Sequence, residues 1–217
     1  MIRIQHHIMI CLIAFGALAA SATYAGETAA EIKQRVGKGN PLAGKAKSEL
    51  CQGCHGEFGV SSEGMIPHLA GQYASYIAKQ LRNFQTGERK HQIMSAMAMT
   101  IDDAQLNDIS AYFASQKKMQ GKGSVDNPIA KKLFLKGDTT RNIQACVSCH
   151  GENGKGKAPN IATFPVIGGQ QKEYLSTQLI SWRKGERTNS QGGVMNKIAK
   201  SLTDAEIEAL SAYISAL

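Results

Sequence analysis

One short motif occurs twice in this sequence, and the repeat constrains the fold more than any other feature. Two cysteines separated by two residues and followed directly by a histidine form the attachment signature of c-type haem. The thiols make thioether bonds to the porphyrin, and the histidine ligates the iron. Two covalently bound haem c groups are therefore expected. Their binding residues are Cys51, Cys54 and His55 in the first half and Cys146, Cys149 and His150 in the second.

The first 25 residues have the order of a secretory signal peptide. Arg3 supplies the early positive charge, an apolar run follows from Ile8 to Ala20, and small residues precede Ala25. The run is shorter than the roughly 20 residues that a bilayer-spanning helix needs, which disfavours an uncleaved anchor. Residues 1–25 are predicted to be removed on export.

Removal of this leader leaves four of the five cysteines, because Cys11 lies within it. Both remaining pairs belong to the haem motifs, so no thiol is left to act as a nucleophile. Disulfides are the alternative in an exported chain, but they do not explain the two histidines. A zinc site is the other alternative, and the distance between the two pairs in the sequence disfavours it.

The rest of the chain is long enough for two domains of about 95 residues each. We predict an N-terminal domain at 26–119 and a C-terminal domain at 120–217, with Gln116–Asn127 as the linker. Without the leader the net formal charge is +7, spread along the chain. This modest excess suits docking to an acidic redox protein, whereas nucleic-acid binding is not expected.

Helical patterns fill both halves, and no strand-like alternation appears. Asn40-Pro41 and Asn127-Pro128 are typical helix starts, the first predicting a helix that continues to the first haem motif. Later helices in both halves have apolar spacing of three and four residues and end at Gly87 and Gly185. The last helix of each half begins with a capping pair. The pairs are Asp102 with Gln105, and Thr203 with Glu206. The predicted fold is all-α, with two tandem domains that each enclose one haem.

The residue opposite each histidine decides whether the iron has an open coordination position. Met195 is the only methionine, histidine or cysteine after Gly151, so it is the candidate in the second half. Met94 is the candidate in the first half, because Met94–Tyr112 and Met195–Tyr213 both span 18 positions. Met97, Met99 and His91 are the alternatives to Met94 and remain open.

A proximal histidine also needs an acceptor for its second ring nitrogen. The carbonyl of Pro67 is predicted to accept that hydrogen bond from His55, and the carbonyl of Pro165 from His150. His68 has no histidine counterpart in the second half, so it is interpreted as a surface or edge residue.

The two motifs, the two prolines, Met94 and Met195 together resemble the cytochrome c4 family, across nearly all of the mature chain. This resemblance implies two class I cytochrome c domains whose haem propionate edges meet across a pseudo-two-fold interface. It also implies a periplasmic electron carrier, associated with the membrane surface. Such a carrier passes electrons from respiratory or dehydrogenase donors to a terminal oxidase or other acceptor.

Histidine and methionine on both irons leave no open position, which favours a carrier and disfavours an enzyme. The alternative is a dihaem electron-accepting subunit of an enzyme complex, such as a flavocytochrome sulfide dehydrogenase. A third reading is an enzyme, either a dihaem peroxidase or a thiosulfate dehydrogenase. The length of the chain argues against the peroxidase, and the lack of a spare cysteine argues against a Cys-ligated catalytic haem.

Overall fold

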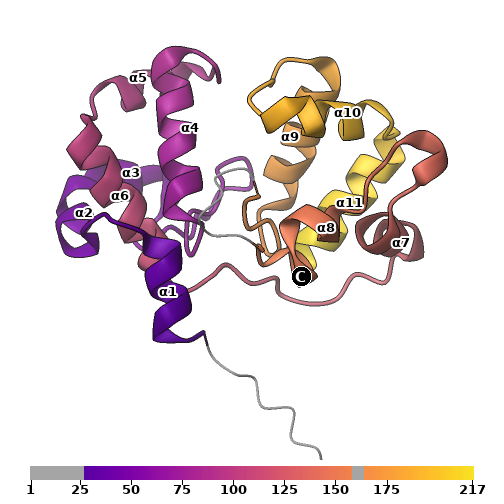
Figure 1. The fold of residues 1–217 in the computed structure, drawn as a ribbon, viewed down its shortest axis with the longest axis horizontal. Helices are drawn as coiled ribbons and strands as arrows, with labels where there is room; N and C mark the ends of the chain where they lie inside the picture. Colours follow the sequence, from indigo (N-terminus) through magenta and orange to yellow (C-terminus); the bar gives the residue numbers. More distant parts are fainter. Residues whose placement is uncertain (1–26, 158–163) are drawn as a thin grey trace, which may run out of the picture.

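The structure, a computed structural model, describes residues 27–157 and 164–217. The predicted leader at 1–25 lies outside this part of the chain. The described residues form two groups of helices side by side and contain no β-strand, which confirms the all-α prediction (Figure 1). The N-terminal group is α1 (Ala29–Val36), α2 (Pro41–Lys47), α3 (Glu49–His55), α4 (Ala74–Thr86), α5 (Gln92–Met99) and α6 (Asp103–Ser115). The C-terminal group is α7 (Pro128–Lys136), α8 (Cys146–His150), α9 (Lys172–Lys184), α10 (Val194–Lys200) and α11 (Asp204–Ala216), with single 3-10 turns at Thr139–Arg141, Glu152–Gly154 and Gln191–Gly193.

The predicted helix ends are confirmed by their hydrogen bonds. The Asn40 side chain accepts from the backbone N–H groups of Leu42 and Ala43, and Asn127 accepts from Ala130. Both predicted capping boxes at the start of α6 and α11 are present. Gly87 and Gly185 end α4 and α9 in the left-handed conformation, which favours glycine.

Helix α1 was not expected, because the residues before Asn40 read as a polar lead. A capping box formed by Thr28 and Glu31 starts it. Arg35, which is buried, joins it to the end of α6 by donating from Nε to the Ala114 carbonyl (2.6 Å) and from Nη2 to the Gln116 carbonyl (3.0 Å). The Thr-x-x-Glu spacing was the signal in the sequence that could have revealed this helix.

The helix predicted from Asn40 to the first haem motif is divided at Ser48. The Ser48 backbone leaves the helical conformation, and its hydroxyl donates to the Lys45 carbonyl (2.9 Å). The break separates α2, which packs on α6, from α3, which carries the cysteines.

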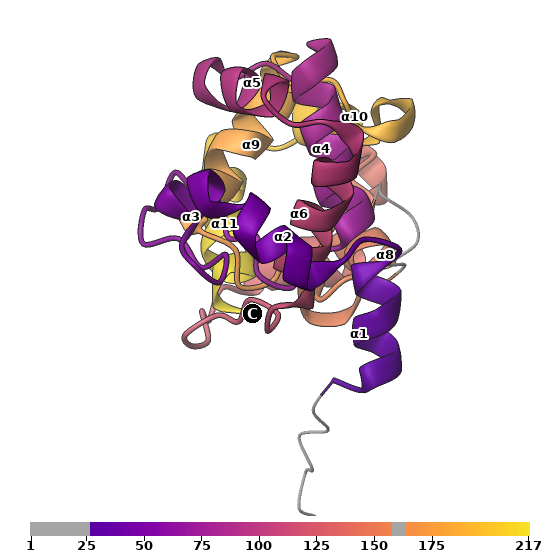
Figure 2. The ribbon, with the colours of Figure 1, turned by 90° about the vertical axis from the view of Figure 1, so that its left-hand side faces the viewer.

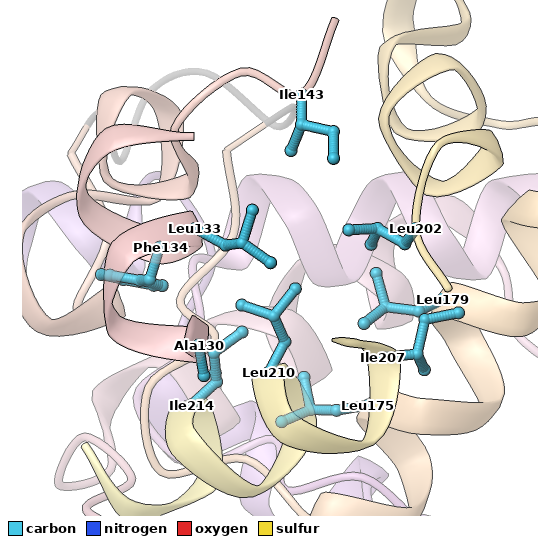
Figure 3. Close-up of a cluster of buried hydrophobic side chains, with 10 residues drawn as sticks. All are labelled: Ala130, Leu133, Phe134, Ile143, Leu175, Leu179, Leu202, Ile207, Leu210 and Ile214. Atoms are coloured by element: carbon cyan, nitrogen blue, oxygen red, sulfur yellow. The ribbon is translucent and has the colours of Figure 1, made fainter. Parts of the chain in front are cut away.

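Each domain has its own apolar core. The C-terminal core gathers side chains from α7, α9 and α11, with Ile143 and Leu202 from the connecting loops (Figure 3). The N-terminal core gathers side chains from α4, α5 and α6. Both cores pack directly against one cysteine of the haem motif and one methionine, namely Cys51 and Met94, and Cys146 and Met195.

The two domains also contact each other closely. The predicted linker is not free along its whole length, because Met119 is buried and its N–H donates to the Ala70 carbonyl (3.3 Å). Gly121 donates to the Leu217 carbonyl (2.7 Å) at the other domain's C-terminus. In the view with one domain in front of the other, α5 and α10 lie at the same end of the molecule (Figure 2).

Candidate cofactor-binding sites

Each haem motif forms a single short helix that ends at its histidine. α8 comprises Cys146 to His150, and Gly151 ends it with a φ of 77°. α3 ends in the same way at His55 and Gly56. All four cysteines of the motifs are free thiols, which contradicts the disulfide alternative. Within the described ranges, no cluster of three or more His, Cys, Asp and Glu residues could hold a metal ion.

The two histidines are held as the sequence predicted. His55 Nδ1 donates to the Pro67 carbonyl and His150 Nδ1 to the Pro165 carbonyl, each at 2.9 Å. Burial lowers the pKa of both imidazoles, against a smaller opposing effect of the proline carbonyls. Each ring is therefore neutral near pH 7, with Nε2 directed away from the loop and available to an iron.

In the C-terminal domain, one pocket brings His150 and Met195 together. Pro165 and Trp182 also line it, and the N-terminal domain contributes Tyr76 among others. Met195 lies in the first turn of α10, where its N–H donates to the Ser190 hydroxyl (3.2 Å). The arrangement places a thioether and an imidazole in the same cavity, as a six-coordinate haem requires.

In the N-terminal domain, the four candidate ligands lie in different surroundings. Met94 is half-buried against the core in the first turn of α5. Met99 is 68% exposed, and Met97 is not part of the core cluster. His91 is exposed, and its Nδ1 accepts from the Met94 N–H (3.3 Å) as the cap of α5. Met94 is the one whose position matches that of Met195.

His68 is half-buried near the domain interface. Its Nδ1 accepts a hydrogen bond from the Ser61 N–H (3.0 Å), and burial lowers its pKa. It takes part in a backbone contact with the other domain and is not aimed at either candidate iron site by any contact that the structure shows.

Two arginines join the domains with near two-fold symmetry. Arg89 donates to Gln80 of its own domain (2.8 Å) and to Tyr174 (3.0 Å) and Gln178 (2.9 Å) of the other. Arg187 mirrors it, donating to Gln178 (2.7 Å) and, across the interface, to Tyr76 (3.1 Å) and Gln80 (3.0 Å). Each arginine follows the glycine that ends a helix by two residues, so the two stand at equivalent positions in the repeat, but the sequence analysis assigned them no role.

This interface is rich in positive charge. Arg89 also lies over the Phe84 ring (4.8 Å) and Arg187 over the Trp182 ring (4.2 Å). Among the residues that the structure describes, neither guanidinium forms an ion pair with a carboxylate. Burial and the Arg187 charge lower the pKa of nearby Lys79. Buried positive charge of this kind is stabilised by an anionic group.

The residues present fit haem c at both sites. Two thiols would attach each haem, the neutral imidazole and the thioether would ligate its iron, and the apolar core would bury it. Trp182 gives independent evidence that a group is bound here, because its Nε1 is buried and has no hydrogen-bond partner among the described residues. A haem propionate would accept a hydrogen bond from Trp182 Nε1, and its negative charge would offset that of the Arg187 guanidinium.

Comparisons with known proteins agree with this geometry. The cytochrome c family model matches twice, at residues 38–117 and 130–217. The chain is 38% identical to cytochrome c4 of Pseudomonas aeruginosa over 182 residues, which cover 82% of this chain and 89% of that protein. It is 34% identical to a thiosulfate dehydrogenase electron acceptor of Stutzerimonas stutzeri over 185 residues, 82% of each chain.

The crystal structure of reduced recombinant cytochrome c4 from Pseudomonas stutzeri superposes on this fold with a TM-score of 0.76. It is 38% identical, and the match covers 82% of this chain and 99% of that one. The two family domains, each with its own attachment motif, indicate two covalently bound haem c groups. This chain belongs to the cytochrome c4 family of dihaem electron-transfer proteins.

Proposed function

We propose that the protein is an electron carrier in which histidine and methionine ligate both irons. The ligands are His55 with Met94 and His150 with Met195. The observation that carries the proposal is the pocket that holds His150 and Met195 together. In the other domain, Met94 packs against its core as Met195 does, which supports the same ligation there. With both axial positions filled by the chain, no position is open for a substrate, so the protein is a carrier and not an enzyme.

Arg89 and Arg187 at the domain interface would hold the haem propionates and offset their negative charge. The absence of carboxylate partners for these guanidiniums, within the described residues, supports the assignment. Such an arrangement allows electrons to pass between the two haems inside one molecule.

The carrier acts in the periplasm, after removal of residues 1–25, as domains 26–119 and 120–217. The charged start and short apolar run of the leader support this location. In the part of the chain that the structure describes, no helix is long and apolar enough to cross a bilayer. Peripheral association with the membrane, through docking to membrane complexes, is part of the proposal.

The partners are redox proteins: respiratory or dehydrogenase donors, and a terminal oxidase or other acceptor. A second candidate is the electron-accepting partner of an enzyme complex. The similarity to a thiosulfate dehydrogenase electron acceptor favours a thiosulfate-oxidising enzyme over the flavocytochrome considered from the sequence. Purification from native cells distinguishes the two, because a stoichiometric enzyme partner contradicts the free-carrier proposal.

The ligand assignment is tested by the weak sulfur-to-iron absorption band at the red end of the oxidised spectrum. Met195→Ala should abolish about half of this band and lower the potential of one haem, because a neutral thioether raises the potential. Met94→Ala should remove the other half. Met99→Ala is the matched control, because this side chain is 68% exposed. Full retention of the band in Met195→Ala contradicts the proposal.

A further inference from the structure

Gln72 of the N-terminal domain binds the backbone of Val166 in the C-terminal domain. Its Nε2 donates to the Val166 carbonyl (2.8 Å), and its Oε1 accepts from the Val166 N–H (2.9 Å). Oε1 also accepts from the N–H of Tyr73 (3.0 Å), which orients the amide group. Gln72 is 4% exposed, so both bonds are shielded from water.

Gln170 makes the same contact in the opposite direction. Its Nε2 donates to the His68 carbonyl (2.9 Å), and its Oε1 accepts from the His68 N–H (2.8 Å). The N–H of Gln171 donates to the same oxygen (2.9 Å). Gln170 is also buried, and its two bonds to His68 mirror those of Gln72 to Val166. Its Nε2 in addition donates to Met119 Sδ (3.6 Å).

The residues that these glutamines bind directly follow the two prolines. The Val166 N–H and the Pro165 carbonyl belong to one planar peptide group, and that carbonyl accepts from His150 Nδ1. The His68 N–H and the Pro67 carbonyl likewise form one peptide group, which accepts from His55 Nδ1. Each proximal histidine is thus separated from a glutamine of the other domain by a single peptide unit.

A peptide group whose N–H is hydrogen-bonded is a stronger acceptor at its carbonyl, because the two bonds polarise the same amide. A stronger acceptor withdraws the Nδ1 proton further and makes the imidazole a better electron donor at Nε2. A more basic imidazole stabilises ferric over ferrous iron, which lowers the reduction potential. The effect passes from one domain to the haem of the other.

We propose that Gln72 and Gln170 are positioning residues that set the potential of the haem in the opposite domain. Gln72 acts on the C-terminal haem through Pro165 and His150, and Gln170 acts on the N-terminal haem through Pro67 and His55. The proposal rests on the ligation of both irons by these histidines. Under this proposal, both reduction potentials depend on the contact between the domains as well as on the proximity of the two haems.

The test is a redox titration of Gln72→Met and Gln170→Met in the full-length holoprotein. Haem methyl signals in proton NMR are assigned to each domain through their contacts with its own cysteine thioethers. Gln72→Met should raise the reduction potential of the C-terminal haem. At a fixed applied potential, the ferrous-to-ferric ratio of that haem should then increase about two- to fourfold. Gln170→Met should do the same to the N-terminal haem, with the other haem unchanged in each variant.

Gln72→Glu is the conservative variant, because a carboxyl group keeps an acceptor oxygen for the Val166 N–H. It should show no rise in the potential of the C-terminal haem. Equal shifts of both haems in both methionine variants would reflect a general loss of the interface and would overturn the proposal. So would a shift confined to the haem of the mutated domain.

The wild-type spectrum separates this proposal from the one on which it rests. If the wild-type protein lacks two low-spin haems with the sulfur-to-iron band, the ligand assignment fails. If it has both and the methionine variants do not shift the opposite haem, only the glutamine proposal fails.

Discussion

At the scale of single residues, the glycines show how closely the helices approach. Gly44 in α2 faces α6, and a Cβ built there would lie 1.9 Å from the Asp108 carbonyl oxygen. The same two helices are joined by Lys47 Nζ to Asp108 Oδ2 (2.7 Å) and by the Asn40 N–H to Asp108 Oδ1 (2.8 Å). These bonds hold the helices at a separation that only a residue without a side chain permits.

Gly44→Ala is therefore expected to destabilise the protein although alanine is the better helix former. The gain in helix propensity is about 1 kcal/mol, whereas forcing packed backbones apart costs about 1–3 kcal/mol. Chemical denaturation should show a net loss of up to about 2 kcal/mol. Gly123→Ala is the matched control, because a Cβ there meets nothing within 4 Å. Equal stabilities of the two variants would contradict the packing argument.

At the scale of elements, the loop before the second haem motif is attached to the start of α11. Arg141 donates to both carboxylate oxygens of Glu206 (2.7 and 3.1 Å) and to Asp138 (2.8 Å). Glu206 is also the capping-box residue of α11, accepting from Thr203. The sequence alone does not predict this contact, because no local pattern reveals a bond between residues 65 positions apart.

The Arg141 contact lowers the pKa of Glu206 from 4.5 to about 2, and the bonds from Thr203 add to this effect. A depressed carboxyl pKa contributes stability that is fully present above about pH 4.5 and is lost as the pH falls towards 2. Glu206→Gln should therefore be less stable than wild type at pH 7, by about 1 kcal/mol.

The difference should shrink as the pH falls through this window, which urea unfolding at pH 7 and pH 3 would measure. Glu208→Gln removes a more exposed charge from the same helix and serves as the control. A difference that stays constant down to pH 2 would show that the pair does not titrate as inferred.

At the scale of the whole molecule, the sequence was most informative where the chemistry is local. The haem motifs, the prolines that bind the histidines and the helix caps each depend on neighbouring residues, so their patterns are sufficient. The family resemblance implied an interface between the domains, but its residues were missed. Gln72, Gln170, Arg89 and Arg187 find their partners only after two domains dock. The repeat held one usable signal, since these polar residues recur at equivalent positions near the start and end of α4 and α9.

The interface gives the last prediction, which concerns cooperativity between the domains. Each interface guanidinium donates to neutral groups of both domains, and loss of hydrogen bonds to a charged group costs about 1.5–3 kcal/mol. The wild-type holoprotein should therefore unfold in one calorimetric transition, because neither domain unfolds without breaking this network. The double variant Arg89→Met and Arg187→Met keeps the apolar stems but removes these bonds, so its domains should unfold in two transitions.

Arg82→Met on α4 is the control, because that side chain pairs with Asp103 on the exposed surface, where an ion pair contributes about 0–1 kcal/mol. A single transition at the wild-type temperature in the double variant would show that the arginines do not couple the domains, and the crossed glutamine contacts would then be sufficient to hold them together.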